Sequence, residues 1–225
     1  MERNSTHYQS SQSRRSALRL IGGTVGAVGA TPVMAALRRA MAAITEGPFY
    51  PSPAYRAQRI DWDADLTTVR SANAPPARAR GEYLDLYGTV VDPDGRPIDQ
   101  AEVEIWQCDV DGSYRHPQGA GARVDAGFQG FGSLRSDAQG GYRFRTIRPV
   151  PYSGRTPHIH VKLRHPSFGE LTSQLFVAGE PGNPRDFLYR SLSAEQLATV
   201  EMKLQRTPAG SATTWYAEQP LVVGR

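Results

Sequence analysis

The sequence predicts an all-β domain, built as a sandwich or a barrel. Short segments with alternating apolar and polar residues recur from residue 81 onward, and turn-forming sequences separate them. The chain has 225 residues, of which 22 are glycine and 17 are proline, so turns are frequent and the length allows a substantial core. Many short strands joined by turns are typical of sandwiches and barrels.

Three segments show the strand pattern most clearly. Apolar residues alternate in residues 83–91, and the turn sequence Asp-Pro-Asp-Gly follows at 92–95. The alternation returns in residues 101–105, and a turn at 137–141 leads into a strand over 142–145. The alternating apolar positions of the first two strands are Leu84, Leu86, Val90, Ala101, Val103 and Ile105.

One helix is predicted near the carboxyl end, and none before it. Ser193 can cap this helix, and Gln196 at the third helical position completes a capping box. Leu197, Val200 and Leu204 would then lie on one face of the helix. The pattern is structural, and we assign the helix no chemistry.

Residues 1–35 have the features of an export signal. Arg14 and Arg15 precede an uncharged stretch, and Val33-Met34-Ala35 has the small-x-small pattern of a cleavage site. Paired arginines at this place resemble a twin-arginine signal, whereas the glycines make the stretch a poor membrane span. We expect an exported protein, periplasmic or extracellular, without a membrane span after cleavage. An ordinary secretion signal or an uncleaved anchor is the alternative.

The next segment, residues 36–80, contains aromatic residues and prolines but few periodic runs. We expect it to form an extended arm that wraps the domain formed by residues 81–225. Residues 1–35 hold four arginines and one glutamate, so the rest of the chain carries little net charge and offers no basic face for nucleic acid. The single cysteine, Cys108, excludes an internal disulfide, and we expect a buried thiol without a catalytic role.

A candidate metal site begins at His158. Polar and apolar residues alternate from here, so a strand would place His158 and His160 on one face. Two imidazoles on one face can bind one metal, although the same pattern also occurs as a simple hydrogen-bonded pair. The other face of the strand would carry Ile159, Val161 and Leu163.

Tyrosines are the nearest anionic oxygen donors to this pair. No carboxylate lies between Asp137 and Glu170, so a ferrous site with two histidines and one carboxylate lacks a local third ligand. Tyr114 and Tyr152 both lie in turn-rich sequence. A phenolate is a hard donor that ferric iron can hold deprotonated, but for either tyrosine alone a core or turn residue with a satisfied hydroxyl is the better explanation.

Seven segments match motifs of one known family, in the order in which that family has them. They are Gly47–Tyr50, Gly88–Asp92, Trp106–Pro117, Phe128–Gly132, Gly141–Pro149, Arg155–His160 and Leu171–Leu175. With these motifs the chain resembles the intradiol ring-cleavage dioxygenases, most closely the protocatechuate 3,4-dioxygenase branch. The resemblance implies a prealbumin-like β-sandwich with an extended N-terminal arm and one short C-terminal helix.

The resemblance also implies a ferric site and its ligands. The family's ligands fall on Tyr114, Tyr152, His158 and His160, and Tyr152 would be the ligand that leaves when substrate binds. The implied reaction uses O2 to cleave a catechol between its two hydroxylated carbons and yields a cis,cis-muconate-type diacid.

Two further residues match family positions that support catalysis. They are Arg155, whose charge would stabilise the anionic ring, and Gln174. The segment between Tyr152 and His158 is shorter than in protocatechuate enzymes, which favours a more open pocket above the iron. The substrate stays open among protocatechuate, catechol, hydroxyquinol and larger lignin-type phenolics.

Two other functions compete with this interpretation. A non-catalytic prealbumin-like extracytoplasmic binding module explains the strands but gives the tyrosines and histidines no joint role. A copper or zinc hydrolase would use His116 with His158 and His160, but no obvious general-base carboxylate accompanies them.

Overall fold

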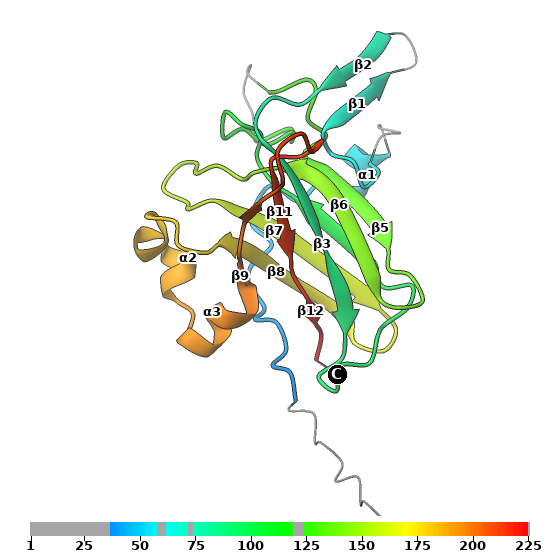
Figure 1. Cartoon of the computed structure of the whole chain (residues 1–225), viewed down its shortest axis with the longest axis vertical. Coiled ribbons are helices and arrows are strands. Elements are labelled where there is room, and N and C mark those ends of the chain that lie inside the picture. Colours follow the sequence, from blue (N-terminus) through cyan, green and yellow to red (C-terminus); the bar gives the residue numbers. More distant parts are fainter. Residues whose placement is uncertain (1–36, 58–61, 72–73, 119–123, 225) are drawn as a thin grey trace, which may run out of the picture. The chain divides into compact units, whose positions relative to one another are not determined.

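The computed structural model describes residues 37–57, 62–71, 74–118 and 124–224, and these residues are mostly β-structure (Figure 1). The all-β prediction is therefore confirmed. The predicted export signal, residues 1–35, lies outside the described residues. None of the described helices is long and apolar enough to cross a bilayer.

Two five-stranded sheets form the body of the domain. One has the strand order β5-β4-β7-β8-β9, and the other has the order β10-β11-β3-β12 with β6 also paired to β3. The strands of the first sheet are β4 (Glu102–Trp106), β5 (Phe131–Arg135), β7 (His158–His165), β8 (Gly169–Val177) and β9 (Glu201–Met202). Those of the second are β3 (Tyr83–Val91), β6 (Gly141–Ile147), β10 (Gln205–Arg206), β11 (Trp215–Glu218) and β12 (Leu221–Val222).

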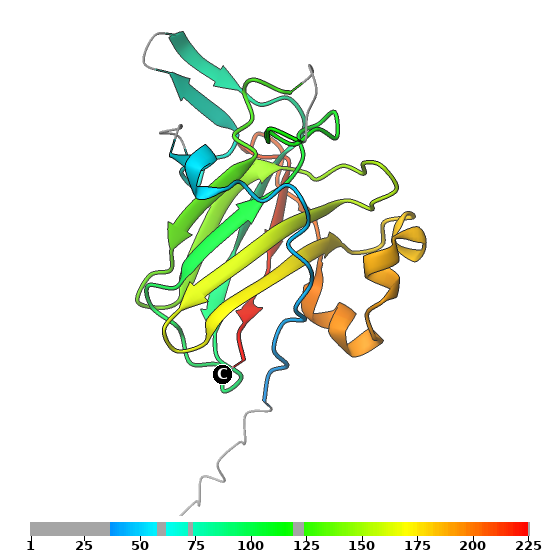
Figure 2. The ribbon, with the colours of Figure 1, turned by 180° about the vertical axis from the view of Figure 1, so that it is seen from behind.

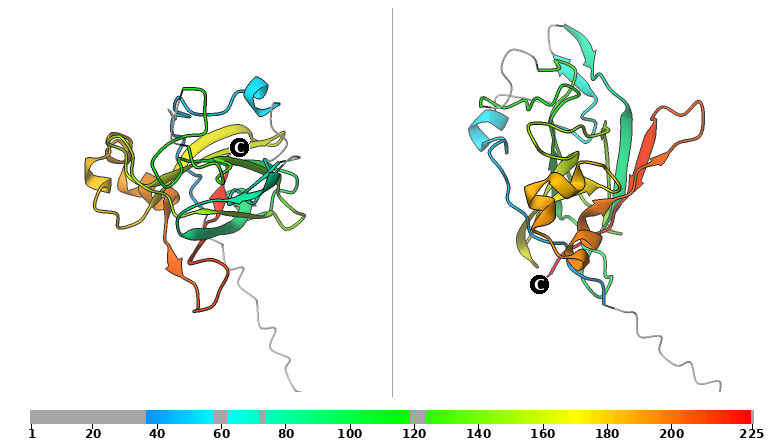
Figure 3. Two further views of the ribbon diagram at one scale, coloured as in Figure 1. Left: turned by 90° about the horizontal axis from the view of Figure 1, so that it is seen from above. Right: turned by 90° about the vertical axis from the view of Figure 1, so that its left-hand side faces the viewer.

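A single apolar core lies between the two sheets, which Figure 3 shows as two layers. The alternating residues predicted from the sequence supply it from both sides: Leu84 and Leu86 come from β3, and Val103 and Ile105 come from β4. Each such side chain contributes about 1.5–3 kcal/mol when it leaves water. The hydrophobic period of two thus decides which face of each strand turns inward.

Both predicted turns are present. The amide of Gly95 donates to the carbonyl of Asp92 at 2.9 Å, and the amide of Gly140 donates to the carbonyl of Asp137 at 2.8 Å. Gly140 has a φ of 74°, a conformation that residues with a Cβ rarely adopt. The first turn lies between β3 and β4 and the second between β5 and β6, so each is part of a connection from one sheet to the other.

The predicted capping box is confirmed at α3 (Ala194–Val200). The Ser193 side chain accepts from the Gln196 amide, and the Gln196 side chain accepts from the Ser193 amide at 2.9 Å. The helix is shorter than predicted and does not reach Leu204, because Glu201 leaves it to pair with β8 as strand β9. Figure 3 shows α3 and α2 (Phe187–Arg190) together at one edge of the sandwich.

The prediction of a single helix was wrong. The 3-10 turn η1 (Asn183–Arg185) and α2 precede α3, and α1 (Pro53–Arg56) lies within the predicted arm. Each of these elements is only three or four residues long, too short to show a helical period in the sequence. Caps and tertiary contacts, rather than a repeating pattern, stabilise such single turns.

The predicted arm is only partly extended. Its first part runs along β8 (Figure 2): the amide of Ile44 donates to the carbonyl of Thr172 at 2.9 Å, and the Ser173 hydroxyl donates to the carbonyl of Ala42 at 2.6 Å. Beyond α1, the antiparallel strands β1 (Thr68–Ser71) and β2 (Ala74–Arg78) form a hairpin that the sequence did not predict. Two prolines within β2 concealed it, since prolines occur in strands mainly at sheet edges.

Candidate metal centre

Strand β7 holds the two predicted histidines in the middle of a sheet. It pairs with β4 on one side and β8 on the other, so its backbone is fixed by hydrogen bonds along both edges. His158 and His160 are each 2% exposed, while the residues between and after them belong to the main core. The predicted separation of the two faces is confirmed.

Two loops bring the predicted tyrosines to this strand. Tyr114 follows β4, after a turn in which the Asp109 carboxylate accepts from the amides of Asp111 and Ser113, each at 2.9 Å. Tyr152 begins a tight turn that is closed by the Arg155 amide, which donates to the Tyr152 carbonyl at 2.7 Å. The first loop follows β4 and the second follows β6. Because both strands are paired within the sandwich, they fix where the two loops begin.

The four predicted ligands converge. The hydroxyl oxygen of Tyr114 lies 3.1 Å from Nε2 of His160 and 3.4 Å from the hydroxyl oxygen of Tyr152. The ring centroids of His158 and His160 are 4.9 Å apart, and those of Tyr152 and His158 are 5.6 Å apart. Two phenol oxygens and two imidazoles thus surround one small volume, an arrangement that a single metal ion can bridge.

The hydrogen bonds of His158 leave one nitrogen available for a metal. Nδ1 lies 2.6 Å from the carbonyl oxygen of Thr156, which can only accept, so Nδ1 carries the proton. Nε2 then has a free lone pair, and it is buried with no hydrogen-bond partner among the residues that the structure describes. A metal-binding histidine typically has this arrangement, in which the outer nitrogen donates to a carbonyl and the inner one binds the ion.

Burial keeps all four groups uncharged when no cation is present. It raises the pKa of Tyr114 well above its usual value of 10.0, with the neighbouring Tyr152 adding to the effect, and it also raises the pKa of Tyr152. It lowers the pKa of His158 to about 4 and that of His160 well below 6.5. The imidazoles are therefore neutral and ready to bind, and a hard cation would supply the positive charge that phenolate oxygens need.

Arg155 and Gln174 are also brought together, as a pair beside the ligands. Nη2 of Arg155 donates to Oε1 of Gln174 at 2.6 Å, and Nε2 of Gln174 donates to the carbonyl of Thr45 in the arm at 3.0 Å. Gln174 is fully buried, and the Arg155 side chain is only 11% exposed. Without the family resemblance Arg155 would be taken for a surface residue, and the structure corrects that view.

The sequence did not identify Asp186, which anchors Arg155. This carboxylate is fully buried: Oδ2 accepts from Nε of Arg155 at 2.8 Å and from the amide of Thr156 at 2.9 Å. Oδ1 caps α2 by accepting from the amides of Leu188 and Tyr189 at 2.9 and 3.1 Å. An Asp ahead of a short helix is a recognisable cap signal, but its second partner is visible only in three dimensions.

Two aromatic residues that the sequence left without a role enclose the deep side of the site. The ring of Phe49 stacks on Tyr114 with centroids 4.5 Å apart and planes 21° apart. Trp106 stacks on His160 at 4.7 Å and 12°. The Gly-Pro-Phe-Tyr motif in the arm was the signal for Phe49, since it matches the family although its partner lies far along the chain.

The alternative three-histidine site is not assembled. Within the described ranges, no group of three or more His, Cys, Asp or Glu side chains has positions suitable for a metal. His116 lies at the rim, where its ring is 6.0 Å from that of Phe49. The predicted buried thiol is present at Cys108, whose pKa burial raises to about 12.

A cavity of about 430 Å³ lies beside the site. It is lined by residues 151–156, which include Tyr152 and Arg155, together with Gly182 and Arg185. A larger cavity, about 710 Å³, lies between the arm, α3 and β3 and contains none of the four candidate ligands. The smaller cavity is therefore the candidate substrate pocket, because it is lined by a candidate ligand and the larger cavity is not.

Comparison with known proteins identifies the family. A family model described as "Dioxygenase" matches residues 50–217. The protocatechuate 3,4-dioxygenase beta chain of Burkholderia cepacia is 33% identical over 169 residues, which cover 67% of this chain and 71% of that relative. The catechol 1,2-dioxygenase of Acinetobacter baylyi is 33% identical over 142 residues, which cover 54% of this chain but only 44% of the relative.

A solved structure shares the fold. It is the dioxygenase domain of a dioxygenase carbohydrate-binding protein fusion from Streptomyces sp. SirexAA-E, with a TM-score of 0.57 and 26% identity. The match covers 83% of this chain and 99% of that one. Since the family match spans most of the sequence, the chain belongs to the dioxygenase family, whose relatives named above are intradiol ring-cleaving oxidoreductases.

Proposed function

We propose that the protein is an exported dioxygenase that binds Fe³⁺ through Tyr114, Tyr152, His158 and His160 and cleaves catechols between their hydroxylated carbons. The observation that carries the proposal is the convergence of these four side chains, together with a buried Nε2 of His158 that has no hydrogen-bond partner in the described part of the chain. Two phenolates and two neutral imidazoles form a hard donor set that suits ferric iron. Ferric iron held by these residues would be chelated by the two oxygens of the catecholate, and its charge would make the ring reactive toward O2.

Tyr152 is the ligand best placed to give way to substrate. It lies on the turn that lines the 430 Å³ cavity, and it is half-buried, whereas Tyr114 is 3% exposed and stacked on Phe49. A catechol entering from the cavity meets Tyr152 first. The phenolate oxygen of Tyr152 is then the base that takes one substrate proton as the side chain moves aside.

Arg155 supplies fixed positive charge on the same side. Asp186 and Gln174 hold its guanidinium in one orientation, so little reorganisation is needed when negative charge develops on the substrate ring. A preorganised donor of this kind is worth on the order of 3 kcal/mol in the transition state. Stacked aromatic side chains on the deep side exclude water from the reacting ring.

The substrate is a catechol, and the names of the relatives do not decide which ring substituents it carries. The two curated relatives are named for protocatechuate and catechol, and the alignment covers only part of each. Both compounds share the adjacent hydroxyl groups that chelation requires. A panel of catechol, protocatechuate, hydroxyquinol and lignin-type phenolics, followed by oxygen uptake, would establish the order of preference.

The test of the iron site is an anaerobic absorption spectrum with an iron assay. Purified protein should contain about one iron per chain and show a visible tyrosinate-to-iron band that shifts when catechol is added. A protein that stays colourless after reconstitution with ferric iron would overturn the proposal. The binding-module alternative would then be preferred.

Export is the second part of the proposal, and it rests on residues 1–35. Their paired arginines are followed by an uncharged stretch and a small-x-small site. Replacement of both Arg14 and Arg15 by lysine keeps the charge but should stop transport by the twin-arginine route. Cell fractionation of wild type and variant measures this, and unchanged export of the variant would contradict that route.

A further inference from the structure

We propose that Arg185 forms a subsite for an anionic ring substituent, so that the protein prefers catechols carrying a carboxylate or a similar group. The inference rests on the proposed function, because it places the substrate in the cavity beside Tyr152.

The cavity has positive charge, and none of the described residues that line it is a carboxylate. Its two charged lining residues are Arg155 and Arg185, and the others are neutral. Arg155 is committed to the site, since it bonds to Asp186 and Gln174. Both oxygens of Asp186 are in turn used by Arg155, Thr156 and the first turn of α2, so this carboxylate cannot also neutralise Arg185.

Arg185 is the other cation that lines the cavity, and its charge is not neutralised by Asp186. Its side chain is exposed and has no hydrogen bond or ion pair with any residue that the structure describes. Its backbone is nevertheless well anchored: the Arg185 amide donates to the Gly182 carbonyl at 2.9 Å, and Asn183 donates to the carbonyl of Val177 at 2.9 Å. A free guanidinium on a fixed turn can present two parallel donors to a carboxylate at the cavity.

The subsite shares the cavity with the turn formed by residues 152–155. Thr156 links the two sides, because its hydroxyl donates to the side chain of Asn183 at 2.7 Å. A catechol that displaces Tyr152 from the cavity side would bring its ring next to this turn and η1, because residues of both line the cavity. A substituent pointing away from the two hydroxyl groups would extend toward Arg185 and solvent.

The test compares Arg185→Gln with the wild type on protocatechuate and on unsubstituted catechol. The variant should lose about 10-fold in kcat/KM for protocatechuate, the effect of about 1.4 kcal/mol, and stay within about twofold on catechol. Arg190→Gln, an exposed arginine on α2 that does not line the cavity, is the matched control. A change that is equal for both substrates, or absent for both, would overturn the subsite.

Binding without turnover separates this inference from the proposed function. Anaerobic titration with 4-hydroxybenzoate and with phenol should show weaker binding of the anionic compound alone in Arg185→Gln, and added salt should reduce the difference. If the wild type binds iron but cleaves no catechol, the proposed function fails. If it cleaves catechol but gains nothing from a carboxylate on the ring, only the subsite fails.

The geometry also points to Asp186 as a positioning residue for both Arg155 and His158. Through Oδ2 it fixes the Arg155 guanidinium and the amide of Thr156, and the carbonyl of that same Thr156 accepts a hydrogen bond from His158 Nδ1. One buried carboxylate thereby orients a cation beside the substrate and holds the residue whose carbonyl sets the histidine tautomer. This second inference depends on the hydrogen-bond network and not on the cavity.

Asp186→Asn tests this role because it separates the two functions of the side chain. The amide oxygen can still cap α2, but the amide nitrogen would face two donors, Nε of Arg155 and the amide of Thr156. We expect kcat to fall about 10- to 100-fold and the tyrosinate-to-iron band to shift, with iron still bound. Ser193→Ala, which removes the cap of α3 away from the site, controls for lost helix capping.

The spectrum decides between a positioning and a structural role. If Asp186→Asn loses thermal stability like Ser193→Ala but keeps the wild-type band and kcat, the residue is only a helix cap. A shifted band and a lower kcat in a variant as stable as Ser193→Ala support the positioning role. Restored kcat in Asp186→Glu would add to that support.

Discussion

The two tyrosines of the candidate metal centre lie on walls of different character. The inner wall, formed by Phe49, Trp106, Tyr114 and His160, is a set of stacked rings, and Tyr114 is 3% exposed. The outer wall consists of Tyr152, Arg155 and Arg185, on two turns that border the cavity, and of Phe187 on α2, whose exposed ring lies 5.4 Å from the Arg155 guanidinium. The same residue type thus occurs in two environments, one closed and one open.

The difference between the walls follows from how the chain makes them. The inner wall rests on β4 and β7, adjacent strands of one sheet, and the arm covers it. In the outer turn Ser153 and Gly154 have φ values of 40° and 79°, and a β-carbon added to Gly154 would meet no described residue other than its chain neighbours within 4 Å. A dense wall keeps a ligand in place, whereas a turn bordered by open space can release one when substrate arrives.

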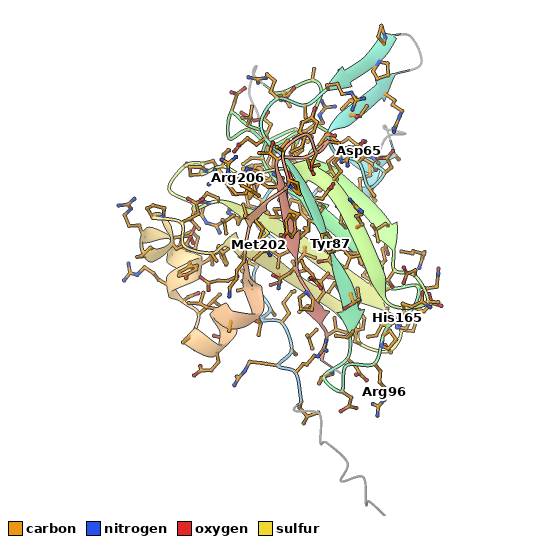
Figure 4. The ribbon with its side chains drawn as sticks, in the orientation of Figure 1. Asp65, Tyr87, Arg96, His165, Met202 and Arg206 are labelled. Carbon is orange, nitrogen blue, oxygen red and sulfur yellow. The ribbon has the colours of Figure 1, made fainter. Side chains whose placement is uncertain are left out.

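Removal of an inner-wall ligand should have the largest effect. His160→Ala should abolish iron binding and reduce activity by more than about 100-fold, because residues that only support metal ligands already account for about 10- to 100-fold. Iron content per chain and oxygen uptake on catechol are the measurements. His165→Ala is the matched control: it lies on the same strand at the far end of β7, away from the site (Figure 4), and should leave both values unchanged.

The two tyrosines provide the direct comparison of the walls. Tyr114→Phe should lose most of the iron and more than about 100-fold in kcat/KM, since the inner wall offers no replacement donor. Tyr152→Phe should keep most of the iron, change its absorption band and lose about 10-fold. Equal iron loss in the two variants would show that the walls do not differ in the way that the geometry indicates.

One aromatic residue of each wall can be removed to compare how much the two walls contribute to the stability of the protein. Phe49→Ala removes the ring stacked on Tyr114 and should lower the free energy of unfolding by about 1–3 kcal/mol. Phe187, on the outer wall, is 65% exposed, so Phe187→Ala should cost less than about 0.5 kcal/mol. Urea denaturation of iron-free protein measures both, and a larger loss for Phe187 would contradict the assignment of the walls.

Local patterns predicted much of the inner wall but little of the outer wall. The period of two in residues 158–163 was enough to place both histidines on one face and three apolar residues in the core. The pairing of Arg155 with Asp186 joins residues 31 apart, and a capping signal says nothing about a second partner at that distance. Periodicity predicts the face of a strand on which a side chain lies. Contacts between turns depend instead on how the strands are connected in three dimensions.

The last predicted effect lies outside both walls, at Asp85 on β3 in the opposite sheet. Burial alone would raise the pKa of this carboxyl, but hydrogen bonds and charges from Arg145 and Arg143 on β6 outweigh burial, so the pKa lies below its usual value of 3.8. The stabilisation is therefore complete above that value and is lost as the pH falls through the lowered pKa. Because both arginines are partly exposed, it should amount to about 1 kcal/mol.

Asp85→Asn tests whether part of the acid sensitivity belongs to the fold rather than to the metal centre. Urea midpoints of iron-free protein at pH 6 should be lower in the variant, and the difference should shrink toward pH 2–3 as Asp85 in the wild type becomes protonated. Iron content at pH 6 should be the same in both proteins, because Asp85 contacts neither wall. A difference in stability that stays constant with pH would mean that Asp85 acts through packing, and the ion pairs of β3 and β6 would then have no part in the acid response.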